Sequence, residues 1–364
     1  MLICEKNSNF AIVLQKDARF MNIYTLLKYY RNIKSPRLKL LGILCFHVFH
    51  RRYLYISVDP SLSCNFRCRL CFFSNPETAA AMKGHFSSED IQALGNTIFH
   101  RALKIQIGCS AEPMTYSKLP ELVKLAHDKG IRNISITTNG SLLTREKLRQ
   151  LVDNGLNEII LSAHGFSKER YEYMMRGGSF DHFQQLLKDI ATVKKEHPQL
   201  MFRINFTMCE ENVEDLKLLP SLFGDFPPDV IQLRPVQDIG STAYDNYSMS
   251  SLLERYEKYI LTTVRFCQEN NISCIYPQKN HLNVIAEENQ KREHFQTVVD
   301  MLPSFYIAPY EGWKNDFNPY EETFEDYSKR THRVRNCLKM LLGIDEGVGQ
   351  KADSVTHSLN YTVK

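Results

Sequence analysis

The segment Ser61–Pro76 reads SLSCNFRCRLCFFSNP and holds three cysteines, Cys64, Cys68 and Cys71, in a CxxxCxxC pattern. Spacings of four and three residues allow one tight loop to direct three thiolates at a common centre. Thiolates are soft ligands that suit iron–sulfur clusters or zinc, and a 4Fe–4S cube normally takes four of them. The next cysteine, Cys109, lies 38 residues further on. The loop therefore offers three ligands and would leave one iron of a cube open to an outside ligand.

Two other interpretations of the three cysteines compete with a cluster. A structural zinc site needs a fourth protein ligand, and the segment offers none in a convincing position. The cysteines could also bind nothing, since free cysteine is among the most buried residue types. The pattern favours the cluster over both.

Length and composition are those of a protein with one large domain and extensions. The chain has 364 residues, of which 43% are hydrophobic and 24% charged, and these values are ordinary for a globular protein. A net charge of +4 is too small to indicate nucleic acid, so no nucleic-acid partner is expected. The ten cysteines show no regular disulfide framework and no secretory signal precedes them, which predicts a cytoplasmic protein with reduced thiols.

Residues 1–52 are basic and are expected to be helical. Between Asp17 and Asp59 there is no acidic residue. The basic residues of that interval are Arg19, Lys28, Arg31, Lys34, Arg37, Lys39, Arg51 and Arg52. The segment either lies on an anionic membrane surface as an amphipathic helix or forms a helical cap on the rest of the protein, and the cap is the preferred interpretation. Met21 opens the first amphipathic run, Ile23–Ile33, and is the expected native start.

From Tyr53 to about Pro235 the chain alternates apolar strands with amphipathic helices, which is the pattern of βα units around a parallel sheet. The expected strands are Tyr53–Val58, Lys104–Gly108, Asn133–Thr138, Glu158–Ala163, Met201–Met208 and Val230–Pro235. Helices are expected after Ser87, Ser117, Thr144, Ser167 and near Asn212, with Gly130 and Gly155 ending two of them. Six units predict an α/β fold, an open partial (β/α)6 barrel with sites at the carboxyl ends of the strands.

A CxxxCxxC loop at the end of a strand, followed by alternating strands and helices, resembles the radical SAM superfamily. The resemblance implies a 4Fe–4S cluster on Cys64, Cys68 and Cys71 whose open iron is chelated by S-adenosylmethionine. It also implies an external electron donor of the flavodoxin or ferredoxin type. Reduction of the cluster then produces a 5′-deoxyadenosyl radical, which takes hydrogen from the substrate. Leu70 stands where the family usually has an aromatic residue.

Two further segments resemble cofactor-binding segments of that family. Residues Gly108–Pro113, GCSAEP, are similar to the family's Gly-Gly-Glu-Pro, which implies that Glu112 meets the amino group of the bound methionine. The alternative is that Glu112 is a surface acid. Asn139, in Thr138-Asn139-Gly140, either reaches the cofactor or adopts a left-handed turn conformation.

Later strand ends supply the remaining candidates. Ser162, in Ser-Ala-His-Gly where many relatives have Ser-x-Asp-Gly, is a candidate donor to the cofactor, and His164 departs from the family at that position. Arg176 begins an Arg-Gly-Gly-Ser-Phe segment that resembles one whose arginine clamps the methionine carboxylate, unless it is a solvated helix arginine. Asn205 and Arg234 are polar residues within apolar strands, and we expect them to face substrate, cofactor or each other.

The carboxyl-terminal third divides into two expected parts. Residues 241–335 are a helical and irregular connector, helical near Ser250–Asn270 with a short strand at Ile272–Pro277 and an aromatic satellite core around Tyr306, Tyr310, Trp313, Phe317 and Tyr320. Residues 336–364 resemble the start of a SPASM extension, an apolar strand and turn. Because no cysteine follows Cys337, this tail is expected to be truncated and without auxiliary clusters. Residues 348–364 are polar and show no periodicity, so they are expected to form an exposed, unstructured terminus. Cys267 and Cys274 are expected to be buried thiols.

These observations divide the chain into a basic helical segment (1–52), a radical SAM core (53–240), a connector (241–335) and an incomplete SPASM-like tail (336–364). The resemblance to SPASM proteins implies a peptide or protein substrate. A small molecule or glycan precursor is the alternative substrate, and a non-catalytic iron–sulfur or zinc scaffold is the alternative from another class. The sequence assigns no catalytic side chain.

Overall fold

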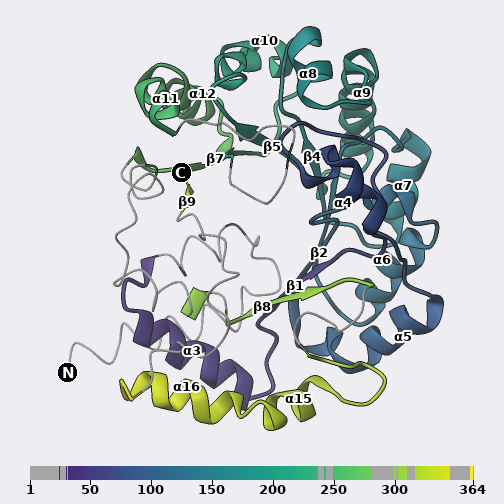
Figure 1. Ribbon diagram of the computed structural model, residues 1–364, viewed down its shortest axis with the longest axis vertical. Helices are drawn as coiled ribbons and strands as arrows, with labels where there is room; N and C mark the ends of the chain where they lie inside the picture. Colours follow the sequence, from purple (N-terminus) through teal and green to yellow (C-terminus); the bar gives the residue numbers. More distant parts are fainter. Residues whose placement is uncertain are drawn as a thin grey trace.

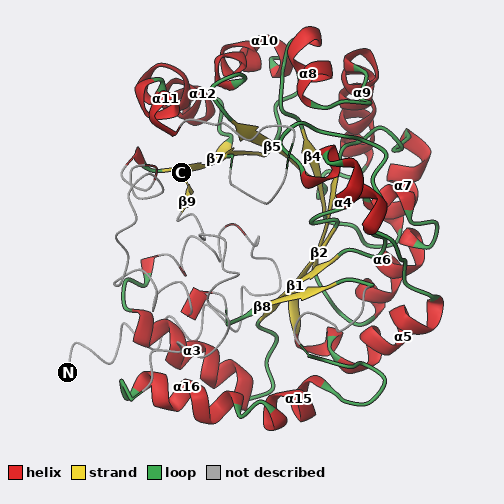
Figure 2. Ribbon diagram, in the orientation of Figure 1, coloured by secondary structure: helices red, strands yellow, loops and turns green. Residues whose placement is uncertain are grey.

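The computed structural model describes residues 32–236, 249–279, 302–309, 316–344 and 361–363, together with residues 24, 30, 242, 282, 299 and 300. Its centre is a nine-stranded sheet in the order β8-β1-β2-β3-β4-β5-β6-β7-β9 (Figure 1). Neighbouring strands from β8 to β7 pair in parallel, and β9 joins β7 in the antiparallel sense. The sheet is curved, with helices along its convex side (Figure 2). The predicted α/β partial barrel is therefore confirmed.

The expected strands are present. The strands are β1 (Leu54–Val58), β2 (Ala102–Ile107), β3 (Asn133–Thr138), β4 (Glu158–Ser162), β5 (Met201–Met208), β6 (Val230–Pro235), β7 (Ser273–Pro277), β8 (Ser304–Ile307) and β9 (Tyr361–Val363). The α-helices are α3 (Pro36–Val48), α4 (Pro76–Ala81), α5 (Ser88–Thr97), α6 (Leu119–Asp128), α7 (Arg145–Asp153), α8 (Lys168–Met174), α9 (Phe180–Glu196), α10 (Leu219–Phe223), α11 (Met249–Glu254), α12 (Thr262–Glu269), α15 (Phe324–Arg330) and α16 (Arg333–Leu341).

Local chemistry sets the ends of these helices as the sequence predicts. Ser87 forms a capping box with Asp90 at the start of α5, and Thr144 caps α7 through the backbone N–H of Lys147. Gly155 follows α7 with φ = 106°, a left-handed conformation that glycine adopts without a Cβ penalty. The helix expected near Asn212 is instead a 3-10 turn, Val213–Leu218, followed by the short α10.

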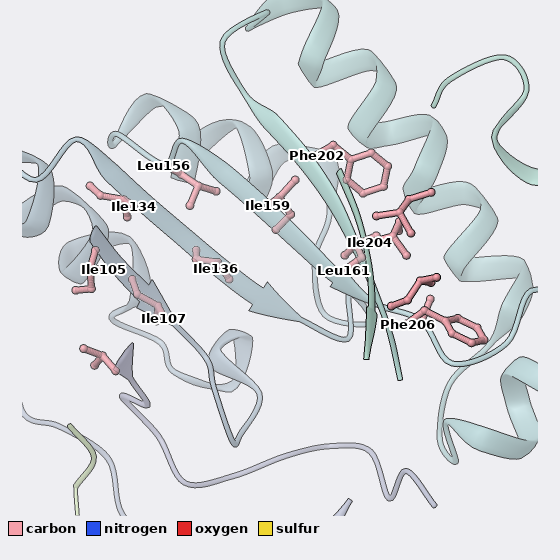
Figure 3. Packing of buried hydrophobic residues seen from close by; sticks show 14 of the residues in the cluster. Ile105, Ile107, Ile134, Ile136, Leu156, Ile159, Leu161, Phe202, Ile204 and Phe206 are labelled. Atoms are coloured by element: carbon pink, nitrogen blue, oxygen red, sulfur yellow. The ribbon is translucent and has the colours of Figure 1, made fainter. Parts of the chain in front are cut away.

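Alternation along the strands separates an apolar face from a polar one. On the convex side Ile105 and Ile107 of β2 pack with Ile134 and Ile136 of β3 in a continuous buried cluster under the helices (Figure 3). The intervening residues face the concave side, where polar side chains gather. Because successive side chains of a strand point to opposite faces, one pattern builds the core and supplies the groups that surround a site.

The amino-terminal end of the concave face is closed by a buried polar network. Tyr24 donates to Glu158, Lys104 Nζ lies 3.1 Å from a Glu158 carboxylate oxygen, and Arg203 donates to the Tyr24 hydroxyl at 3.0 Å. Burial alone would raise the pKa of Glu158, but Lys104 and then Arg203 hold it below its usual range. The network leaves the carboxyl ends of the strands as the open end of the fold.

The region expected as a connector contributes to the sheet itself. Residues 304–307 form β8, which pairs with β1, and the predicted strand at 272–277 is β7 beside β6. Phe305, Phe317, Phe324 and Tyr327 make edge-to-face contacts beside β8, whereas Tyr310 and Trp313 lie outside the described residues. The proposed domain boundaries at 53, 241 and 336 remain predictions.

The structure corrects two expectations for the tail. Residues 336–341, expected as an apolar strand, belong to helix α16, where Cys337 and Met340 are buried. Residues Tyr361–Val363, expected to be unstructured, pair with β7. Helix periodicity explains why residues 336–341 are helical, because residues 337 and 340 lie three apart and share one face of a helix. Residues 345–360 lie outside the described part of the chain.

The basic amino-terminal segment contains α3, which is packed on the fold as the cap interpretation requires. Leu40, Ile43 and Leu44 of α3 are buried in the main core, and Lys39 forms an ion pair with Asp300 at 3.1 Å. Residues 1–23, including Met21 and Arg19, are outside the described residues, as are Lys28 and Arg31.

Candidate active site

The loop that carries the three cysteines, Ser61–Cys71 (the cysteine loop), follows β1 at the carboxyl edge of the sheet. Phe66 and Leu70, which alternate with the cysteines, are buried in the main core, while Cys64, Cys68 and Cys71 stay half-buried. Burial of the apolar residues fixes the loop and leaves the thiols near its surface. Leu70, which departs from the usual aromatic residue of the family, therefore serves as a core residue here.

The three thiols share an environment that disfavours the thiolate. Burial raises the pKa of Cys64 to about 11, and burial followed by the neighbouring Cys71 and Cys64 raises the pKa of Cys68. A group of positive irons reverses such shifts, because a coordinating thiol is deprotonated by its metal. The donor set is thus three adjacent sulfurs that need a cationic centre to ionise.

The arrangement of donors suits a cluster better than a single ion. Within the described residues, no three His, Cys, Asp or Glu side chains converge as ligands of one metal ion. Zinc would draw every sulfur to about 2.3 Å from a common point, whereas a 4Fe–4S cube takes its thiolates at different irons. Three thiols in one loop, with no fourth ligand found beside them among the described residues, therefore fit a cube with one open iron and disfavour the structural-zinc alternative.

Glu112, in the loop after β2, is buried between the cysteine loop and β3. It is 2% exposed, which excludes the alternative that it is a surface acid. Its carboxylate accepts hydrogen bonds from Thr138 Oγ1 at 2.6 Å, Asn139 N at 2.8 Å and Met114 N at 3.0 Å. Its backbone N–H donates to Ser63 O at 3.0 Å. Burial raises the pKa of Glu112, and these three donors oppose the rise.

Asn139 joins the turn after β3 to the cysteine loop. Its Nδ2 donates to Asn65 Oδ1 at 3.0 Å, and its Oδ1 accepts from Ser141 N at 2.9 Å. The left-handed residue of this turn is Gly140, with φ = 80°, and not Asn139. The turn interpretation of Asn139 is therefore wrong in its detail, because glycine takes the positive φ and leaves the amide to bridge two loops.

The segment after α8 approaches the cysteine loop from the other side. The backbone N–H of Arg67 donates to Arg176 O at 2.9 Å, and a Cβ on Gly178 would lie 3.1 Å from the Phe66 ring. Gly177 has φ = 98°, so glycine is required there for conformation. Arg176 lies beyond the end of α8, so it is not a helix residue. Its side chain is exposed, as the solvated alternative expects, and makes no recorded hydrogen bond with a described residue.

Ser162 and His164 stand at the carboxyl end of β4. Ser162 is half-buried and pairs in register with Asn205 of β5. His164 Nδ1 accepts a hydrogen bond from Thr207 N at 3.1 Å, which places the ring proton of the neutral form on Nε2. The histidine that replaces the family's acid is thus fixed to the next strand.

Asn205 and Arg234 differ in their surroundings. Asn205 is buried, and its Oδ1 accepts from Arg203 Nε at 2.8 Å, so its polarity is satisfied within the chain. Arg234 is exposed at the concave face and has no recorded hydrogen bond or ion pair with a described residue. Of the three expected alternatives, facing substrate, cofactor or each other, the last has no recorded hydrogen bond to support it among the described residues. Arg234 is left able to bind an anionic group.

Asp59, which the sequence reading missed, organises the loop that follows β2. It is fully buried and accepts hydrogen bonds from Cys109 N at 2.7 Å, Ser110 N at 3.0 Å, the Ser110 hydroxyl, and Tyr306 OH of β8 at 2.7 Å. A possible signal was an acid placed directly between a buried strand and Pro60. Asp59 thereby positions the backbone that leads to Glu112.

The neutral state of His164 predicts a pH dependence of stability. Burial, and then the Arg234 cation, lower the pKa of His164 to about 4 from 6.5. The unfolded chain therefore binds the proton first, so this stability is complete above about pH 6.5 and is lost as pH falls toward about 4. As pH is lowered from about 6.5 to about 4, we expect the urea midpoint of His164→Gln to fall less steeply than that of the wild-type protein. His182→Gln, at an exposed position of α9, is the control. Equal slopes for all three proteins would contradict the prediction.

Comparison with known proteins gives matches in sequence and in fold. A sequence model of the radical SAM superfamily matches residues 58–219. A probable GTP 3′,8-cyclase of Metallosphaera sedula is 25% identical over 197 residues, which cover 54% of this chain and 60% of that protein. The chain thus spans less than two thirds of this relative.

Two solved structures share the fold. The first is SuiB of Streptococcus suis bound to precursor peptide SuiA, with 18% identity, coverage of 79% of this chain and 63% of SuiB, and a TM-score of 0.54. The second is anSMEcpe with bound AdoMet and the Cp18Cys peptide, with 16% identity, coverage of 77% and 82%, and a TM-score of 0.54. At these identities the likeness concerns the fold alone.

Proposed function

We propose that this chain, whose residues 58–219 form a domain of the radical SAM superfamily, cleaves S-adenosylmethionine reductively and uses the product to modify a peptide or protein. The 4Fe–4S cluster and S-adenosylmethionine of that family supply a 5′-deoxyadenosyl radical when an external flavodoxin- or ferredoxin-type donor reduces the cluster. One observation carries the proposal. Separate loops at the carboxyl edge of the sheet are hydrogen-bonded around the three thiols, through Glu112, Asn139 and Arg176.

The residues around the thiols divide into two proposed roles. The side chains of Ser162 and Arg176 have no recorded hydrogen-bond partner among the described residues, so they can donate to the carboxylate or ribose of S-adenosylmethionine. Glu112 and Asn139 already hold neighbouring loops, so their contribution is to fix the backbone and to present the remaining lone pairs of the carboxylate and amide. Cys64, Cys68 and Cys71 would hold the cluster.

One observation supports a peptide or protein as the substrate. Both structural neighbours are complexes with a bound peptide. A small molecule is the second candidate, since the curated relative is a probable GTP 3′,8-cyclase. Arg234 is exposed at the concave face and has no hydrogen bond or ion pair recorded with another described residue. It favours this candidate because a guanidinium pairs well with phosphate or carboxylate.

Anaerobic reconstitution tests the proposed activity. The enzyme should become brown, bind about four irons per chain, and release 5′-deoxyadenosine from S-adenosylmethionine when reduced. A zinc scaffold would stay colourless and inert. Peptide and small-molecule fractions of a cell extract, added separately, then show which class raises the yield of 5′-deoxyadenosine above the substrate-free background.

Replacement of Glu112 by glutamine is expected to weaken binding of S-adenosylmethionine while leaving the iron in place. The change removes the negative charge. It also turns the amide NH2 group toward Asn139 N–H or the Thr138 hydroxyl, which are both donors to the wild-type carboxylate. Two donors cannot bond each other, so the loop that carries residue 112 shifts. Loss of a charge-assisted bond costs about 1.5–3 kcal/mol, or roughly ten- to hundredfold in Kd. Calorimetric titration and iron analysis measure the two effects. Glu121→Gln, at an exposed position of α6, is the control, and an unchanged Kd for Glu112→Gln would exclude the role.

The iron content also tests the prediction that the tail, residues 336–364, holds no auxiliary cluster. Cys337 is buried in α16 and belongs to the main core, so it is a core residue. We therefore expect about four irons per chain, the content of one cube. Eight or more irons, with a second cluster that survives replacement of Cys64, Cys68 and Cys71 together, would show that an auxiliary cluster exists.

A further inference from the structure

Exposed apolar side chains concentrate on two helices outside the candidate active site. Ten large hydrophobic side chains of the described residues are exposed, and eight of them lie on α3, on α16 or in the turns that follow these helices. The eight, here called the α3–α16 face, are Leu38, Leu41, Phe46, Val48, Phe49, Leu338, Leu342 and Ile344. Phe49 is 70% exposed and Leu342 is 72% exposed. A gathering of this kind on one surface marks an interaction site.

Helix α3 is apolar on both of its sides. Leu40, Ile43 and Leu44 face the core, while Leu38 and Leu41 face away from it. A helix that only covers a core carries polar residues on its outer side. The cap interpretation explains the inner side of α3 and leaves the outer side without a partner among the described residues.

The two helices lie side by side and form one surface (Figure 1). His47 of α3 is hydrogen-bonded at 2.9 Å to Ser328 of α15, the helix that precedes α16. At the other end of α3, Arg37 reaches the position of Gly343, which follows α16. An open groove of about 690 Å³ between them is lined in part by Val48, Leu338 and Leu342. The apolar side chains of both helices are therefore continuous.

The two helices of this face carry charge of one sign, and the acid that lines the groove, Glu325 of α15, is paired with Arg101 at 3.3 Å. Neither Pro36–Val48 nor Arg333–Leu341 contains an aspartate or glutamate. The nearby basic residues for which no carboxylate partner is recorded within the described residues are Lys34, Arg37, Arg51, Arg335 and Lys339. Two copies of such a face would repel each other, which disfavours self-association, whereas an anionic surface would be attracted.

We propose that the α3–α16 face binds the surface of an anionic phospholipid bilayer. The apolar side chains enter the boundary between headgroups and acyl chains, and the basic side chains meet lipid phosphates, as in interfacial helices. No described helix has the length and apolar composition needed to cross a bilayer. The inference rests on exposure and charge and is independent of the proposed radical chemistry.

Vesicle co-sedimentation of the full-length reconstituted protein tests the inference. Vesicles of phosphatidylcholine with phosphatidylglycerol are compared with pure phosphatidylcholine, and we expect at least about tenfold tighter binding to the anionic vesicles, weakened by salt. Leu41→Gln with Leu342→Gln, and Arg335→Glu with Lys339→Glu, should each lower binding by about tenfold or more. The control is Tyr173→Gln with Tyr320→Gln, which alters the two other exposed large side chains and should bind as wild type does.

Several results would overturn the inference. They are no vesicle binding by the wild-type protein, equal binding to both lipid compositions, or unchanged binding by the two α3–α16 double variants when circular dichroism shows them folded. A concentration-dependent dimer that the same variants abolish, without vesicle binding, would assign the face to self-association instead.

Discussion

Replacing Cys64, Cys68 or Cys71 by alanine is expected to remove the cluster and all cleavage of S-adenosylmethionine. The structure offers three half-buried thiols in one loop, and the described residues provide no further group of ligands that converges there. Two thiolates cannot hold a cube that normally takes four ligands. Iron content should therefore fall from about four per chain to near zero, the brown colour should be lost, and 5′-deoxyadenosine should not form.

Cys109→Ala is the matched control for this prediction. Cys109 is accessible in the loop after β2, and its Sγ lies 3.8 Å from Gln106 O, outside the cysteine loop. The Cys109→Ala protein should keep its iron and its brown colour. If Cys109→Ala alone lost the cluster, the assignment of three ligands within one loop would be wrong. Circular dichroism separates loss of iron from loss of fold in every variant.

The strand pattern was predictable because burial imposes it locally. Strands β3, β5 and β6 have the predicted bounds, since each is an apolar run closed by glycine, proline or polar residues. The cysteine loop was predictable for a similar reason, because the ligand spacing is contained within eight residues.

Contacts between distant segments were not predictable in this way. Tyr306 reaches Asp59 across 247 residues of sequence, and β8 completes the sheet beside β1 from a region whose composition predicts irregular structure. A four-residue strand leaves little periodicity to detect. Its place depends on pairing with an edge that local sequence does not specify.

The candidate site likewise combines residues that the sequence predicts with contacts that it does not. The sequence identified Glu112 as an important acid, but it did not reveal that the carboxylate is buried and bonded to Thr138 and Asn139. Those contacts depend on where the ends of β2 and β3 lie relative to each other at the edge of the sheet. Likewise, the pairing of Arg176 O with Arg67 N depends on how the turn after α8 folds back over the cysteine loop.

Lys104→Met is expected to cause a large loss of stability. Lys104 and Glu158 are both buried and lie 3.1 Å apart, so the variant keeps the volume of the side chain and leaves the Glu158 carboxylate without its nearest cation. Removing one partner of a buried pair typically costs about 3–5 kcal/mol. Anaerobic urea unfolding should show the midpoint shift, with Lys124→Met as the control. Lys124 and Asp128 form an exposed pair four residues apart on α6, which is worth less than about 1 kcal/mol.

The sign of the pH dependence gives this prediction a second test. Lys104 and Arg203 hold the pKa of Glu158 below its usual range, against burial. The stability from that depression is present above the unfolded pKa of 4.5 and is lost as pH falls through the lower folded value. The gap between wild type and Lys104→Met should therefore narrow as pH falls below about 4.5. Lys104→Met with Glu158→Gln should recover part of the loss, because no unpaired charge remains. A Lys104→Met midpoint equal to that of Lys124→Met would show that the network beneath the site does not stabilise the fold.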